Sequence, residues 1–214
     1  MNSSIETILL YTIAAGLLSI VYGYFTGKNI LNSSPGNFKM QEIASAIQIG
    51  EIAEEFDCMY YEEPVNYLNH SLHAKVADKV TVPIAGGERL YNRWGVRPYL
   101  EDQSIDVLQP DIGLCGGFTE TKKVCDYADI FDVRIQAHVC GGPVATAAAL
   151  HLETAIPNFL IHEHHTYAIK KWNRELCLQD PQPKNGFFEV SEEPGLGIEL
   201  NDEIVMRSQR VEIK

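Results

Sequence analysis

After residue 51, the apolar positions of the chain gather into five short runs, each with ionisable residues at or near its end. The runs are "CMYYEEP" (58–64), "VPIAGGE" (82–88), "IDVLQPD" (105–111), "VRIQAHV" (133–139) and "NFLIHEH" (158–164). Short apolar runs bounded by turn-forming residues predict buried strands. Between them, apolar residues at roughly helical spacing predict helices within 67–80, 91–104, 117–131 and 142–157.

This alternation of strand and helix predicts an α/β fold with a parallel sheet. The ionisable residues at the run ends recur at intervals of 23 to 27 residues and are Glu62, Glu88, Asp111, His138 and Glu163. Functional groups at the carboxyl ends of successive strands are typical of a (β/α)8 barrel site. An open doubly wound sheet is the alternative, but it would gather its ligands at a single switch point.

The first fifty residues follow a different pattern. Residues 7–27, between Glu6 and Lys28, carry no formal charge. At helical rise these residues would span about 30 Å, the thickness of the hydrocarbon of a bilayer, so we predict a transmembrane helix. A cleaved signal peptide is less favoured because no positive charge precedes the apolar stretch, and a buried soluble helix is the other alternative. Lys28 and Lys39 follow the span, which places the downstream chain in the cytoplasm, anchored to the inner membrane.

Charge divides the chain at about the same point. The formal net charge is −12, and residues 1–50 sum to zero, so the whole acidic excess lies in residues 51–214. Such a balance argues against a nucleic-acid partner. Five cysteines without C-x-x-C spacing suit reduced thiols better than disulfides or a zinc site.

The segment "IHEHHTY" (161–167) raises the question of a metal site, because three histidines surround one glutamate. On a strand, His162 and His164 would share one face, and Glu163 and His165 the other. Four ligands cannot then converge on one ion, so we do not expect a histidine metal cage.

Residues 51–205 resemble the enolase superfamily, in particular the mandelate racemase and muconate lactonizing enzyme group with its galactonate-type acid-sugar dehydratases. The resemblance rests on "YYEEPVN", "VPIAGGERLYNRWG", "DVLQPDIGLCGGFTETKKV", "QAHVCGGPVATAAALHLETAIPNF", the "HE" dipeptide and "NGFFEVSEEPGLGIEL". It implies a partial TIM barrel made of strands 4 to 8 in residues 51–165. Residues 166–214 would form a C-terminal tail that packs on a capping domain.

The resemblance also implies roles for the residues at the run ends. Glu62 and Glu88 match two of three Mg²⁺ ligands, and hard carboxylate oxygens suit that cation. Glu63 would point away, because neighbours on a strand face opposite sides. His138 matches an acid or base, and Asp111 matches the partner that fixes its tautomer.

Glu163 matches the carboxylic acid that hydrogen-bonds the substrate carboxylate, and His165 would contact the substrate, while His162 and His164 would be structural. The implied reaction removes the proton α to a carboxylate, stabilises an enediolate with magnesium and expels the β-hydroxyl of a small acid sugar as water. A racemase or cycloisomerase ancestry is the alternative.

The chain also departs from the family. A third magnesium ligand, a second acid or base and three earlier strands have no counterpart here, so we expect a fragment that is inactive alone. Residues 1–50 instead resemble the start of a membrane pyrophosphate-energised proton pump, through the stretch "GKNILNSSPGNFKMQEIASAIQIG" (27–50). A non-catalytic, membrane-anchored half-barrel that associates with another chain is the competing hypothesis. If the barrel part folds, we expect a homo-oligomer. In the tail, "NG" (185–186) predicts a hairpin turn.

Overall fold

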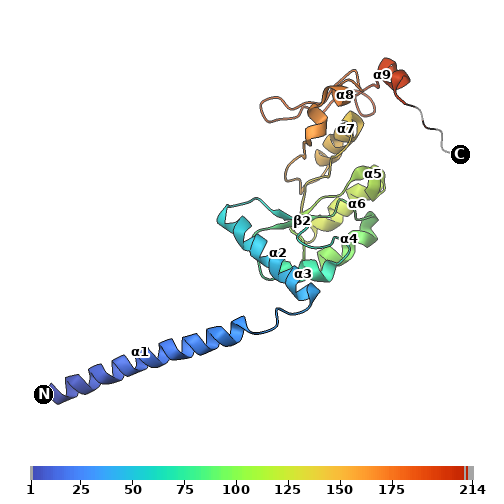
Figure 1. The fold of residues 1–214 in the computed structure, drawn as a ribbon. Coiled ribbons are helices and arrows are strands. Elements are labelled where there is room, and N and C mark those ends of the chain that lie inside the picture. The colour runs from blue at the N-terminus through green and yellow to red at the C-terminus, as the bar shows by residue number, and fades with distance from the viewer. Residues whose placement is uncertain (1, 210, 212–214) are drawn as a thin grey trace. The chain divides into compact units, whose positions relative to one another are not determined.

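The fold alternates short parallel strands with helices, as a computed structural model of the chain shows (Figure 1). It describes residues 2–209 and 211, and for residues 2–6, 8 and 9 it describes the backbone alone. The helices are α1 (Asn2–Leu31), α2 (Phe38–Glu55), α3 (His70–Ala77), α4 (Asn92–Glu101), α5 (Ile112–Cys115), α6 (Gly117–Asp129), α7 (Pro143–Glu153), the 3₁₀ helix η1 (Thr166–Ile169), α8 (Lys171–Arg174) and α9 (Asp202–Arg207). The strands are β1 (Tyr61–Glu62), β2 (Ile84–Gly86), β3 (Val107–Leu108) and β4 (Arg134–Ile135).

The chain divides into two compact units, residues 1–41 and 42–214. In the first unit, α1 confirms the predicted helix, and its residues 10–25 are apolar for the most part and exposed. Its stretch Leu10–Leu31 has a mean hydropathy of 1.3 and is long and apolar enough to cross a membrane. One such helix near an N-terminus is weak evidence of a membrane span, so insertion of residues 7–27 stays a prediction.

In the second unit, the strands form one parallel sheet in the order β1-β2-β3-β4. Glu62 is aligned with Ala85, Gly86 with Leu108, and Leu108 in turn with Ile135. The fifth predicted strand contributes a single parallel bridge, between Ile135 and Phe159, beyond β4. Each run therefore takes its place next to the previous one, in the order of the chain, as consecutive elements usually do. The parallel α/β prediction is confirmed, and α3, α4, α6 and α7 lie within the predicted ranges, whereas α2 was not predicted as a helix.

Local signals explain where two helices begin. The side chain of Asn69 accepts a hydrogen bond from the Leu72 amide at the start of α3. Asp111 caps α5 in the same way, with its Oδ1 accepting from the Leu114 amide at 3.0 Å. These are ordinary N-cap contacts, which satisfy amides that lack a partner within the helix.

The core lies between the sheet and its covering helices. The larger cluster joins β3, β4, α4, α6 and α7 through fully buried residues such as Leu100, Leu108, Val124 and Ile135. A smaller cluster joins α2 and α3 to β2 around Val76 and Ile84. Because the strands are buried by helices, their apolar side chains determine the register, and the polar residues just beyond them are carried to one edge.

The C-terminal tail has little regular structure apart from its short helices. Lys184 and Phe187 form an antiparallel bridge around Asn185 and Gly186, whose φ angles are 53° and 83°. Positive φ at both central residues is what a type I′ hairpin turn needs, so the predicted "NG" turn is confirmed. A second antiparallel bridge pairs Cys177 with Leu200. All five cysteines are free thiols, as expected.

Candidate active site

The ends of the strands position the predicted site residues at one edge of the sheet. Glu62 is the last residue of β1, and Glu88 lies two residues beyond β2. Asp111 and His138 each lie three residues beyond their strands, β3 and β4. Since all strands run parallel, their carboxyl ends meet at the same edge.

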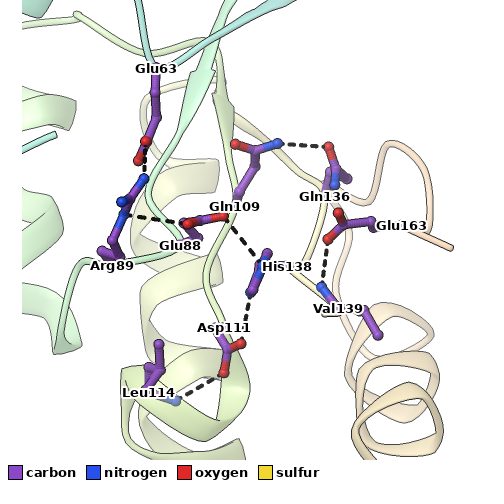
Figure 2. A network of polar contacts seen from close by, with 10 residues as sticks. All are labelled: Glu63, Glu88, Arg89, Gln109, Asp111, Leu114, Gln136, His138, Val139 and Glu163. Carbon is purple, nitrogen blue, oxygen red and sulfur yellow. Dashed lines mark hydrogen bonds and ion pairs between the residues drawn. The ribbon is translucent and has the colours of Figure 1, made fainter. Parts of the chain in front are cut away.

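Three of these side chains are in direct contact, as Figure 2 shows. His138 Nδ1 lies 2.8 Å from Asp111 Oδ2, and His138 Nε2 lies 3.3 Å from Glu88 Oε2. All three side chains are about one fifth to one quarter exposed, at 19%, 23% and 25%. The imidazole therefore lies between two carboxylates in a partly desolvated position.

This arrangement shifts the proton affinity of both members of the His138–Asp111 pair. The hydrogen bond with Asp111 raises the pKa of His138 against the effect of burial, and the charges of Glu88 and Glu163 add to the increase. Burial alone would raise the pKa of Asp111, but hydrogen bonds from His138 and from the Leu114 and Gly113 amides, with the charge of His138, lower it overall. The pair thus favours a protonated imidazole beside an ionised carboxylate.

Glu88 contacts cationic groups through both of its oxygens. Oε2 faces His138, and Oε1 lies 3.3 Å from Nε of Arg89. Arg89 also pairs with Glu63 and lies over the ring of Tyr67, 4.3 Å from its centroid. A guanidinium held by a carboxylate and an aromatic face keeps a fixed orientation, so Arg89 holds Glu88 in place.

Glu63 does not lie where strand alternation predicted. We expected it to face away from the site, yet its carboxylate pairs with Arg89, which also contacts Glu88 (Figure 2). The physical reason is the backbone, because Glu63 follows the last residue of β1 with φ = 40°, outside strand geometry. Alternation ends with the strand and does not extend to the next residue.

Glu163 reaches the same edge from the fifth apolar run. Its Oε2 accepts a hydrogen bond of 2.6 Å from the amide of Val139, the residue after His138. Its neighbours face elsewhere, since the rings of His162 and His164 both contact Phe188. His165 accepts a hydrogen bond from the Tyr167 amide through Nδ1 and packs on the Tyr167 ring, so its described contacts are local.

A second layer of polar side chains supports the site. The Tyr60 hydroxyl donates to Gln136 Oε1 at 2.7 Å, and Gln109 Nε2 donates to the same oxygen at 2.9 Å. Burial, and then the charges of Glu62 and Glu163, raise the pKa of the Tyr60 phenol. The Tyr60 ring therefore lies within electrostatic range of the two carboxylates that come from opposite ends of the sheet order.

Sequence reasoning missed this second layer, although a signal was present. Tyr60, Gln109 and Gln136 each precede a predicted site residue by two positions, in "YYE", "QPD" and "QAH". On the seven-residue strands that the sequence predicts, residues two apart would share a face, which would place each of the three beneath the site residue that follows it. Arg89 left no such signal, because its partner Glu63 comes from another strand.

The pair of His138 and Asp111 opens on a cavity of about 410 Å³. Its other walls are the start of α5 and small residues of α7, namely Ile112, Gly113, Gly142, Val144, Ala145, Ala148 and Ala149. A cavity of this size is within the range that small ligands occupy. A small molecule in this cavity would lie next to His138 and Asp111.

Carboxylates that could bind a metal are Glu62 and Glu88. Among the residues that the structure describes, no group of three or more His, Cys, Asp or Glu side chains is arranged to hold an ion. Two carboxylates from neighbouring strands still fit Mg²⁺ in kind, because this cation usually takes one or two protein carboxylates and completes its shell with water and substrate.

Comparisons with known proteins bear on the fold and the descent of the chain. A family model described as "Enolase C-terminal domain-like" matches residues 39–204. A D-xylonate dehydratase of Haloferax volcanii is 36% identical over 157 residues, which are 73% of this chain and 38% of that protein. A D-galactarolactone cycloisomerase of Agrobacterium fabrum is 34% identical over 166 residues, 74% of this chain and 44% of that protein.

Among solved structures, a putative dehydratase from Salmonella enterica serovar Typhimurium is 58% identical, with a TM-score of 0.75 over 77% of this chain and 41% of that one. The chain thus spans about two fifths of the length of these relatives. No support emerges for the likeness of residues 1–50 to a proton pump, and the family match begins at residue 39, inside that segment.

Proposed function

Because the chain belongs to the enolase superfamily, through a match to its C-terminal domain over residues 39–204, we propose that residues 51–214 derive from a magnesium-dependent acid-sugar dehydratase of the galactonate type. The observation that carries the proposal is the contact series Glu88–His138–Asp111 at the ends of three successive parallel strands. The relatives of the chain include sugar-acid dehydratases and cycloisomerases. The proposed architecture is the second half of a (β/α)8 barrel, residues 51–165, followed by the tail 166–214.

His138 would act on a proton during the reaction. Asp111 holds its Nδ1 and raises its pKa, so the imidazole keeps a proton on Nε2 closer to neutral pH. Dehydration requires one group to take the proton from the α-carbon and another to give a proton to the departing β-hydroxyl, which leaves as water. The raised pKa supports the second role for His138, donation to the leaving hydroxyl.

Magnesium would be held by Glu62 and Glu88. When bound, it would stabilise the negative charge that grows on the substrate carboxylate as the α-proton leaves. Arg89 would keep Glu88 oriented through their 3.3 Å contact. Glu163, next to His138 through Val139, would hydrogen-bond the substrate carboxylate, and His165 would contact the substrate from the following turn.

A cycloisomerase is the second candidate, and the Agrobacterium relative favours it. Both reactions begin with removal of an α-proton, so the residues present here serve either one. A non-catalytic half-barrel is the third reading, because the resemblance assigns one more metal ligand and one more acid or base to strands that have no match in this sequence. We propose a cytoplasmic location and self-association for residues 51–214, and a membrane anchor at residues 7–27.

Metal binding is the first test, and it needs no turnover. Mn²⁺ binding to the full chain, followed by electron paramagnetic resonance, should weaken by about ten-fold or more in Glu88→Gln and in Glu62→Gln, because each loses a carboxylate ligand. Glu189→Gln is the matched control, since Glu189 is 80% exposed and pairs only with Lys184 among the contacts described. Equal Mn²⁺ affinity in all four proteins would refute the metal assignment.

Activity is the second test. The chain alone, and the chain joined to an upstream barrel segment that carries the third magnesium ligand and the second acid or base implied by the resemblance, are incubated with Mg²⁺ and a panel of acid sugars and their lactones. Semicarbazide detects the α-keto acid that dehydration yields. We expect product only from the joined protein and its loss in His138→Asn. No product from the joined protein with any of these compounds would favour the non-catalytic reading, and a ring-opened product formed only from lactones would favour the cycloisomerase.

A further inference from the structure

A second cavity lies on the other side of the segment that carries Glu163. Its volume is about 570 Å³, within the range that drug-sized ligands occupy. It is lined by the end of α7, the fifth apolar run and the hairpin of the tail. Its walls are mostly apolar and include Glu153, Phe159, His162, His164, Phe187 and Phe188.

A buried acid–imidazole pair lies in the wall of this cavity. His162 Nδ1 is 2.7 Å from Glu153 Oε2, and the two side chains are only 8% and 4% exposed. The His162 ring packs edge-on against Phe188, with centroids 4.6 Å apart. This pair shares no residue with the site around His138.

The other ring nitrogen of His162, Nε2, is buried and lacks a hydrogen-bond partner among the residues that the structure describes. A buried polar atom without a partner is costly, so a native protein normally supplies one from a side chain, water or ligand. When the Nδ1 proton is directed at the Glu153 carboxylate, Nε2 presents a lone pair as an acceptor. A hydrogen-bond donor would then satisfy it.

The walls indicate what kind of molecule would bring that donor. Phe159, Phe187 and Phe188 give the cavity three aromatic rings, and aromatic ligands pack well against such rings in edge and offset geometries. The hydroxyl of Thr154 already donates to the α7 backbone. Glu153 Oε1 and the ring nitrogens of His164 also lack a hydrogen-bond partner among the described residues, so the walls offer a few polar contacts among many apolar ones. Such walls suit a ligand with one or two polar groups better than a polyhydroxylated acid sugar.

We propose that this cavity is a second ligand site, which binds a small hydroxyaromatic compound whose hydroxyl donates to His162 Nε2 while its ring packs among the three phenylalanines. The site is independent of the proposed dehydration, because its residues do not touch Glu88, Asp111 or His138 in any contact that the structure describes.

Three probes of similar size test the proposal on the unmodified full chain: 4-methylphenol, 4-methylanisole and toluene. Binding is followed by long-range ¹H–¹⁵N NMR spectra, which report the Nε2 resonance of His162. We expect 4-methylphenol to saturate the site and shift that resonance, with affinity about ten-fold above that of 4-methylanisole, which cannot donate. Equal affinity for all three, or no saturable shift with 4-methylphenol, would overturn the proposal.

A variant of His162 tests whether its Nε2 is the atom that accepts the hydrogen bond. His162→Phe keeps an aromatic ring but removes the acceptor, so it should bind 4-methylphenol and toluene equally well. His70→Gln is the control, because His70 is 43% exposed and pairs with Asp102 on a different part of the fold. Retained preference for 4-methylphenol in His162→Phe would contradict the assignment of Nε2. These measurements contain no metal and no acid sugar, so their outcome and that of the dehydratase tests are separate.

Discussion

Replacing Asp111 by asparagine tests whether the hydrogen bond to His138, rather than the surroundings in general, sets the behaviour of the imidazole. The Asp111 carboxylate accepts hydrogen bonds from His138 Nδ1 at 2.8 Å, from the Leu114 amide at 3.0 Å and from the Gly113 amide. Asparagine is as good an N-cap as aspartate, so α5 should keep its cap. The variant therefore removes the charge from the His138 contact and leaves the cap in place.

The expected loss of stability follows from the geometry. A hydrogen bond between charged groups contributes about 1.5–3 kcal/mol, against about 1 kcal/mol for a neutral one. The side chains of His138 and Asp111 are 19% and 23% exposed, so solvent screens part of the charge interaction. We expect Asp111→Asn to lower the free energy of unfolding by about 1–2 kcal/mol when the imidazole is charged.

The loss should depend on pH in a defined direction. The folded state raises the pKa of His138 above its ordinary value of 6.5, so the contribution of its charge is complete below that pH and disappears as pH rises through the higher folded value. The folded state lowers the pKa of Asp111 below 3.8, so its contribution is complete above that pH and disappears on acidification through the folded value. The variant should differ most from the parent between about pH 4 and 6.5, and least at alkaline pH.

Urea unfolding at several pH values and NMR titration of His138 measure both quantities. Asp126→Asn is the control, because Asp126 is 51% exposed and pairs with Lys122 one helical turn away. The reasoning fails if His138 in Asp111→Asn titrates at the same pH as in the parent, or if the stability difference grows as the solution becomes more alkaline.

Three further substitutions test the scaffold by urea unfolding at neutral pH. Asn158→Ala should lower the free energy of unfolding by about 2–4 kcal/mol, because the buried amide of Asn158 donates to the Cys125 and Val133 carbonyls at 3.1 and 2.9 Å. A loss under about 0.5 kcal/mol would show that water replaces the amide. Leu108→Ala, at a fully buried position, should cost about 2–5 kcal/mol. Gly87→Ala should cost about 1–3 kcal/mol, since φ is +117° and the new Cβ would lie 2.7 Å from Leu108 Cδ1. In the Leu108→Ala background that cost should fall, and simple additivity of the two would contradict the clash.

Local and periodic features of the fold were predictable from the sequence, whereas the extent of the strands was not. Helix α6 covers residues 117–129 of the predicted range 117–131. The agreement is close because buried residues recur at helical spacing as far as Ala128, near the end of the helix. The apolar runs of seven residues yield strands of two or three, because pairing stops where the backbone turns. Glu63 and Gly87, at φ angles of 40° and 117°, end β1 and β2 in this way, and apolar composition does not reveal those angles.

For the candidate site as well, part of the arrangement was predictable from the sequence and part was not. Glu88, Asp111 and His138 could be brought together in advance, because a fixed interval between strand ends places their residues at one edge. The orientation of the Glu88 carboxylate could not be predicted, because it depends on Arg89. The contacts of Arg89 with Glu63 and Tyr67 join residues more than twenty positions apart. Sequence spacing carries no information about such pairs when they do not belong to the repeating unit.

The fifth apolar run carries Glu163 of the candidate site and His162 of the second cavity. This leads to a final prediction. Glu163 lies on the side of His138, where its carboxylate accepts a hydrogen bond from the Val139 amide, and His162 packs against Phe188 in the second cavity. Two neighbouring residues thus serve opposite faces of one segment, so their substitutions should act separately. Glu163→Gln should leave the affinity for 4-methylphenol within about two-fold of the parent, and His162→Phe should do the same for Mn²⁺. A ten-fold loss in either cross-measurement would mean that the segment moves as a whole and that the two faces are coupled.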